Sequence, residues 1–194
     1  MAARYTIGTS TNLDAGQICD ALDYEFGVFW DDLRAPATAI NPIGPVSAPS
    51  PDATTPGLLF EAGKDQMIYI VMQLPHTWKM GTSIYPHIHW EPATNNIGTV
   101  KWQLSYRWRN HGATAAALTD LTLLTLTTGG VANVLRYDAF DTISGDTKDI
   151  SSMLQIALSR TGTADSFTGS ARLLEFDIHY QVDSRGSRQE RSKY

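Results

Sequence analysis

The chain has 194 residues, of which 42% are hydrophobic and 18% charged, and its net charge is -5. This composition is ordinary for a single globular domain, and the negative charge argues against a protein built to bind DNA or RNA. The longest apolar stretches are far shorter than the roughly 20 residues of a membrane span. No basic segment followed by an apolar one opens the chain, so we expect no secretory signal, and the single cysteine excludes an internal disulfide.

The first quarter of the chain predicts an arm, a strand and a long loop. Residues 1–23 have few periodic apolar positions, which is typical of an extended N-terminal arm. Residues 24–30 alternate as a strand, ended by Asp31 and Asp32. Residues 35–57 then contain six prolines. Because proline fixes φ and removes a backbone donor, we expect a surface loop rather than a helix or a central strand.

Two segments in the middle of the chain predict a pair of strands, each with one apolar and one polar face. Successive side chains of a strand point to opposite faces. In residues 84–91 this alternation separates Ile84, Pro86, Ile88 and Trp90 from Tyr85, His87, His89 and Glu91. In residues 100–109 it separates Val100, Trp102, Leu104, Tyr106 and Trp108 from Lys101, Gln103, Ser105, Arg107 and Arg109. The two apolar rows predict a buried core that includes the tryptophans and Trp78.

Further strands are expected at residues 58–60, 67–74, 131–143, 151–160 and 171–183, with a strand-like segment around residues 121–127. In the last strand, simple alternation places Arg172 and Leu174 on the face of Phe176, opposite Leu173 and Asp177. Residues 184–194 are polar and basic and predict a flexible, solvated tail. About eight strands without a convincing amphipathic helix predict an all-β fold: an antiparallel β-sandwich of the jelly-roll type over residues 24–183.

The sharpest candidate site is a metal site on the polar face of the first middle strand. His87 and His89 project from one face and can chelate a divalent ion, with Glu91 as an oxygen ligand. The interval from Gly81 to these histidines resembles the first motif of the cupin family. Glu91 departs from that motif, because only Trp90 separates it from His89, and no second cupin motif follows. A solvated or subunit-facing strand face is the alternative, since the larger apolar row belongs inside.

Other polar groups give less specific signals. Glu175, Asp177 and His179 share one face of the last strand and could perform acid–base chemistry. Asp31 and Asp32, together with Glu175 and Asp177, keep a glycosidase-like carboxylate pair conceivable, although the sequence does not place them across a cleft. No nucleophile motif or phosphate-binding glycine loop accompanies them. The basic row of Lys101, Arg107 and Arg109 could contact acidic partners or form a charged solvent face.

Several short segments together resemble a group of tailed-bacteriophage virion proteins. These are residues 29–34, 41–42, 74–79, 86–90 and 171–180, which span nearly the whole chain. The resemblance implies a jelly-roll structural subunit that decorates the capsid or belongs to the tail, found in the virion after synthesis in the host cytoplasm. It implies no enzymatic activity, no cofactor, no membrane contact and no direct contact with nucleic acid.

The same resemblance implies partners and an interface. The partners would be the major capsid protein or tail and portal proteins, together with further copies of the chain, for example in a trimer. The arm and the loops would dock on these neighbours, and the expected contact residues are Trp30, Asp31, Asp32, Leu33, Arg34, Asn41 and Pro42. Two other functions remain open: a cupin-like metal-binding protein that uses His87, His89 and Glu91, and a carbohydrate- or receptor-binding module with Tyr85 or Trp78 as an aromatic platform.

Overall fold

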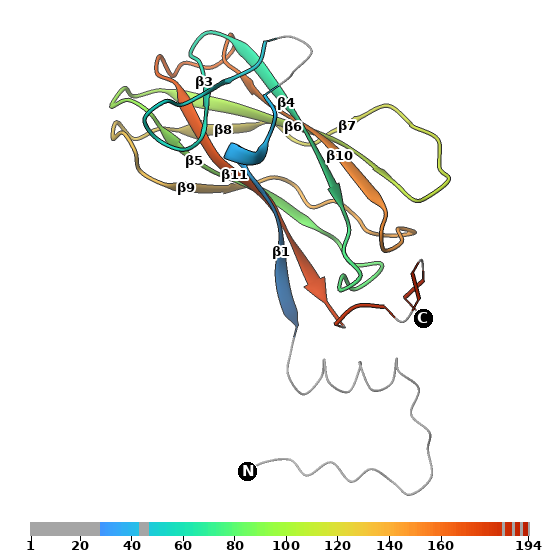
Figure 1. Cartoon of the computed structure of the whole chain (residues 1–194). Helices are drawn as coiled ribbons and strands as arrows, with labels where there is room; N and C mark the ends of the chain where they lie inside the picture. The colour runs from blue at the N-terminus through green and yellow to red at the C-terminus, as the bar shows by residue number, and fades with distance from the viewer. Residues whose placement is uncertain (1–27, 43–46, 184, 188, 191, 194) are drawn as a thin grey trace, which may run out of the picture.

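The computed structural model describes residues 28–42, 47–183, 185–187, 189, 190, 192 and 193, and it has two antiparallel sheets that face each other (Figure 1). The first sheet has the order β2 (Ser50–Pro51), β3 (Leu58–Phe60), β11 (Ala171–Val182), β5 (Tyr85–Pro92) and β9 (Arg136–Ala139), and β1 (Phe29–Pro36) also pairs with β11. The second sheet has the order β4 (Asp65–Gln73), β10 (Met153–Thr161) and β6 (Thr99–Arg109), with β7 (Thr119–Asp120) and β8 (Leu124–Thr127) both on β6.

The predicted fold class, an antiparallel β-sandwich of the jelly-roll type, is therefore confirmed. Among the described residues eight strands have four residues or more, and η1 (Ala37–Ala39) is a single turn of 3-10 helix. No helix in the described ranges is long and apolar enough to cross a membrane. The predicted arm, residues 1–23, lies outside the described residues.

The core fills the space between the sheets with the apolar rows that strand alternation predicts. Ile88 of β5 and Leu104 of β6 are fully buried, and so are Ile68 of β4 and Ile178 of β11. The four tryptophans predicted for the core, Trp78, Trp90, Trp102 and Trp108, are at most 7% exposed. Since each large aromatic side chain buries on the order of 150–250 Å², these residues supply much of the apolar burial.

Two predicted strand boundaries are wrong. β1 does not end at Asp31 and Asp32 but continues through them to Pro36, because its backbone pairs with β11 over eight consecutive positions. The strand predicted over residues 131–143 is shorter in the structure, where β9 has only four residues. It begins later than predicted because the chain turns at Asn133, which has a positive φ of 58°. The proline-rich loop is also not wholly on the surface, because Ala37 is completely buried.

A β-bulge in β11 changes which side chains face the core. The register against β5 shifts between Leu173 and Glu175, so Leu174 has no direct partner. As a result Leu173 joins Phe176 in the core, and Arg172 points to the outer face of the sheet. This is opposite to the alternation expected from the sequence.

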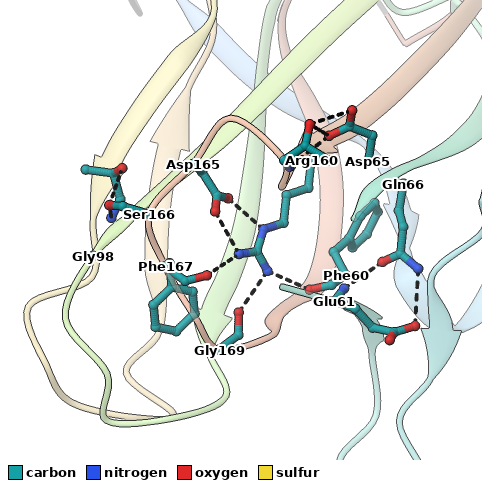
Figure 2. Close-up of polar contacts among 12 residues, drawn as sticks. Phe60, Glu61, Asp65, Gln66, Gly98, Arg160, Asp165, Ser166, Phe167 and Gly169 are labelled. Carbon is teal, nitrogen blue, oxygen red and sulfur yellow. Dashed lines mark hydrogen bonds and ion pairs between the residues drawn. The ribbon is translucent and has the colours of Figure 1, made fainter. Parts of the chain in front are cut away.

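A buried arginine ties three segments at one end of the sandwich (Figure 2). Arg160 of β10 donates from Nε and Nη2 to the carboxylate of Asp165, at 2.8 and 3.2 Å. Its remaining three N–H groups donate to the backbone carbonyls of Phe60, Phe167 and Gly169 at 2.8 to 2.9 Å. All five guanidinium donors are thus satisfied away from water, which joins the loop after β10 to β3.

Two of the described residues near the C-terminus contact the sandwich. Lys193 is only 6% exposed and contacts Asp183 and the carbonyl of Trp78. Ser187 bonds His76 at the ring Nδ1. The burial of Lys193 differs from the solvated tail that the basic composition predicts, because Asp183 supplies a partner for its ammonium group. Arg185, Gln189 and Glu190 are exposed.

Candidate metal centre

A cluster of histidine and aspartate side chains lies on the outer face of the first sheet, where β1, β11, β5 and β9 are neighbours. The pairing register places Asp177 of β11 opposite His87 of β5, and His179 opposite Asp32 of β1. Directly opposed side chains of antiparallel strands are about 5 Å apart at Cβ. The histidines of β5 do face away from the core, as predicted.

Three side chains of this cluster offer ligand atoms within 4.8 Å of one another: His87, Asp177 and His179. The side chains of His87 and Asp177 are 1% and 5% exposed, whereas that of His179 is 38% exposed. His87 Nε2 and Asp177 Oδ1 face each other in close contact, and neither makes a regular hydrogen bond. Two buried polar atoms therefore face each other, and the partly exposed His179 offers a third ligand atom within 4.8 Å.

Outer contacts orient both imidazoles of the cluster. His87 Nδ1 lies 3.4 Å from the backbone carbonyl of Tyr85, so donation there leaves Nε2 with a free lone pair toward Asp177. His179 Nε2 lies 3.1 Å from Asp32 Oδ1, which leaves Nδ1 as its free nitrogen. Metal-binding histidines usually donate their second N–H to a carboxylate or carbonyl in this way.

His89 and Tyr137 complete the surroundings. His89 Nε2 is 3.5 Å from Asp177 Oδ2, but His89 is not one of the three residues whose ligand atoms lie within 4.8 Å of one another. The Tyr137 ring lies over His87, with ring centroids 4.5 Å apart. Burial, followed by the charges of Asp177 and Asp32, raises the pKa of the Tyr137 hydroxyl, because negative charges disfavour the phenolate.

Glu91, the third ligand expected from the sequence, is not part of this cluster. Its carboxylate contacts Arg172 Nη1, and the Nε–H of the same guanidinium donates a hydrogen bond to Asp52 Oδ2 at 2.7 Å. The reason is register: Glu91 lies opposite Arg172, two positions farther along β5 than His89. The structure therefore does not bring Glu91 to His87 and His89, and Asp177 and His179 lie beside His87 instead.

The carboxylates considered for acid–base chemistry are held in different ways. Glu175 accepts two hydrogen bonds from Arg34, at 2.6 and 2.8 Å. Asp31 accepts from the Tyr180 hydroxyl at 2.8 Å on the inner side of β1. Asp177 contacts His87 and His89, and Asp32 contacts His179. Asp31 lies opposite Tyr180 and Glu175 lies opposite Pro36, so the sheet does not bring Asp31 and Glu175 together as a pair.

The residues expected to form an interface are mostly on β1. Trp30 is 50% exposed and packs edge-to-face on Tyr85, with ring centroids 5.2 Å apart. Leu33 is half-buried against the core. Asn41 and Pro42 follow η1, exposed and half-buried respectively. Trp78, one of the two aromatic residues considered as a carbohydrate platform, is buried, so only Tyr85 keeps that possibility.

No family model and no curated protein sequence matches this chain. Among solved structures it is similar to the isomalto-dextranase of Arthrobacter globiformis T6, at 16% identity and a TM-score of 0.48, over 76% of this chain and 23% of that one. It is also similar to the C-terminal CBM6 of the laminarinase LamC from Zobellia galactanivorans, at 15% identity and a TM-score of 0.37, over 76% and 98% of the two chains. A third, TmCBM61 with bound β-1,4-galactotriose, has 12% identity and a TM-score of 0.34, over 80% and 88%. At such identities the likeness concerns the β-sandwich fold alone.

Proposed function

We propose that this protein is a non-catalytic binding module that holds one divalent transition-metal ion between His87, Asp177 and His179. The observation that carries the proposal is the convergence of three ligand atoms within 4.8 Å, two of them on buried side chains. Ligand atoms about 2.1 Å from a common tetrahedral ion are about 3.4 Å apart, so shifts on the order of 1 Å would bring His179 inward and open the close contact between His87 and Asp177.

The ligand set favours a borderline metal such as Zn²⁺. Two imidazole nitrogens and one carboxylate suit Zn²⁺ or another first-row transition metal, whereas Ca²⁺ takes six to eight oxygen ligands. His89, whose Nε2 lies 3.5 Å from the Asp177 carboxylate, would have to move toward His87 and His179 to supply a fourth ligand. A four-ligand site would be structural, while a three-ligand site would keep one position open for a bound partner.

The test is calorimetric titration of the chelator-stripped protein with ZnCl₂. We expect one ion per chain, and we expect binding to weaken as the pH falls, because protons compete for the histidine nitrogens. Saturation should also stabilise the fold, by about 2.7 kcal/mol when free zinc is 100-fold above Kd. His87→Ala/Asp177→Ala should abolish both effects.

The matched control is Glu91→Gln, which changes a carboxylate on the same strand outside the cluster. It should leave the stoichiometry and Kd of zinc binding unchanged, even if the loss of the Arg172 contact lowers stability. A wild-type protein that binds no zinc, or a double variant that binds as well as the wild type, would overturn the proposal.

We propose a structural subunit of a phage virion as a second function, which the sequence resemblance predicts. Its support in the structure is the free edge of β1, which pairs with β11 alone among the described strands and exposes Phe29 and Trp30 to 50% each. An unpaired strand edge with exposed apolar side chains is a site for pairing with another chain. Trp30→Ser should shift the protein toward the monomer in light scattering without changing its circular dichroism; an unchanged mass would argue against this edge as the interface.

Carbohydrate binding is a third candidate, supported by the Trp30–Tyr85 pair on the same outer face as the histidine cluster. Aromatic rings in this position can stack on sugar rings. A glycan array probed with the wild type and with Tyr85→Ala tests it, and equal signals from the two proteins would exclude Tyr85 as the platform.

A further inference from the structure

A cavity of about 370 Å³ lies at the C-terminal end of β6. It opens between residues 110–119, which lead from β6 into β7, and the loop at residues 144–148. Three cationic side chains line it: Arg107, Arg109 and Lys148. Its lining contains no aspartate or glutamate. The carboxylates that flank Lys148 nearby in sequence, Asp146 and Asp149, are therefore not part of its wall.

None of the three cations is neutralised by an ion pair within the described part of the chain. Arg107 donates from Nε to Gln155 and from Nη1 to the carbonyl of Ala116, at 3.0 and 2.7 Å. Arg109 donates from Nη2 to Gln155 at 2.9 Å, and its buried Nε makes no hydrogen bond. Lys148 donates to the carbonyl of Trp108 at 3.2 Å. These acceptors are all uncharged.

Uncharged acceptors position the cations without cancelling their charge. Three positive charges around one partly enclosed cavity repel one another, and that repulsion is relieved when an anion enters. The two arginine side chains are also held in place, because both guanidinium groups donate a hydrogen bond to Gln155 Oε1. The entropy of ordering them is thus already lost before a ligand binds.

The rest of the lining suits a compact polar ligand. Thr114, Thr119, Ser144 and Thr147 supply hydroxyl groups. We propose that this cavity binds a small sugar-sized molecule that carries a phosphate, sulfate or carboxylate group. This site does not depend on the metal cluster, which lies on the other sheet.

The test is an NMR titration of the ¹⁵N-labelled protein with three probes: glucose 6-phosphate, glucuronate and glucose. We expect the phosphate or the carboxylate probe, or both, to shift the resonances of residues 107–110 and 147–148, and we expect glucose to shift them far less. A response to glucose 6-phosphate alone would identify phosphate as the anion, and a response to glucuronate alone would identify a carboxylate. Raising the NaCl concentration should weaken binding, because salt screens charge.

The variants Arg107→Gln and Lys148→Gln remove one cation each and should weaken binding about 10- to 100-fold, as expected for a lost charge-assisted hydrogen bond. Lys101→Gln is the matched control, because Lys101 lies on the same strand outside the cavity lining. Its Kd should equal that of the wild type. The proposal fails if no anionic probe shifts these residues, or if Lys101→Gln weakens binding as much as the cavity variants.

Discussion

Replacement of Arg160 by methionine should destabilise this protein more than any surface charge change. The Arg160 and Asp165 side chains are 0% and 1% exposed, so the substitution leaves a buried carboxylate without its partner. It also removes the donors to three backbone carbonyls. Breaking a buried ion pair on one side costs about 3–5 kcal/mol. This is a large fraction of the 5–15 kcal/mol that typically stabilises a domain.

The assay is urea denaturation followed by the fluorescence of the five tryptophans. Arg34→Met is the matched control, because Arg34 makes the same two-point contact with Glu175 but its side chain is 62% exposed. It should cost no more than about 1 kcal/mol. Arg160→Met/Asp165→Leu, which removes both buried charges, should cost less than Arg160→Met alone. If Arg160→Met and Arg34→Met lowered the free energy of unfolding equally, the reasoning from burial would be refuted.

Three further predictions concern single positions. Gly145→Ala places a Cβ 2.1 Å from the carbonyl oxygen of Thr82. We expect the free energy of unfolding in the same urea assay to fall by about 1–3 kcal/mol or more. An unchanged denaturation midpoint would mean that this loop moves freely. Burial raises the pKa of the Tyr180 hydroxyl from 10.0 to about 12. The unfolded chain therefore releases this proton at a lower pH than the folded protein, and the free energy of unfolding falls as the pH rises between these two values. Tyr180→Phe should make that fall smaller in urea denaturation at a series of pH values. Asp32→Asn removes the carboxylate that orients His179 and should weaken zinc binding about 10- to 100-fold in a chelator competition, and an equal affinity would argue against His179 as a ligand.

Strand alternation accounts for the parts of the fold that were predicted correctly. Where every second residue is apolar, as in residues 84–90 and 100–108, a strand can bury all of these side chains only by turning that one face toward the core. The core tryptophans and the outward direction of His87 and His89 follow from it. Alternation fails in β11 because the bulge at Leu174 adds one residue, and nothing in the local sequence distinguishes that residue from its neighbours. Arg172 and Leu173 therefore exchange faces.

The candidate metal centre was visible in the sequence only as two separate polar faces. His87 and His89 stood out by their spacing, and Asp177 and His179 were noted as a second face about 90 residues later. Evidence in the sequence that β5 and β11 are neighbouring strands would have brought these two polar faces together as one candidate site. Glu91 was chosen instead because it is close in sequence, but along a strand it lies about 7 Å beyond His89.

The sequence by itself determined the class of fold, the inner and outer faces of the middle strands, and the residue types available for chemistry, because these depend on local periodicity and composition. Only the tertiary structure decided which polar residues meet. Strand order and register are set by how the whole core packs. Contacts such as His87 with Asp177, or Arg160 with the carbonyl of Phe60, therefore join residues that are far apart along the chain and that no local pattern links.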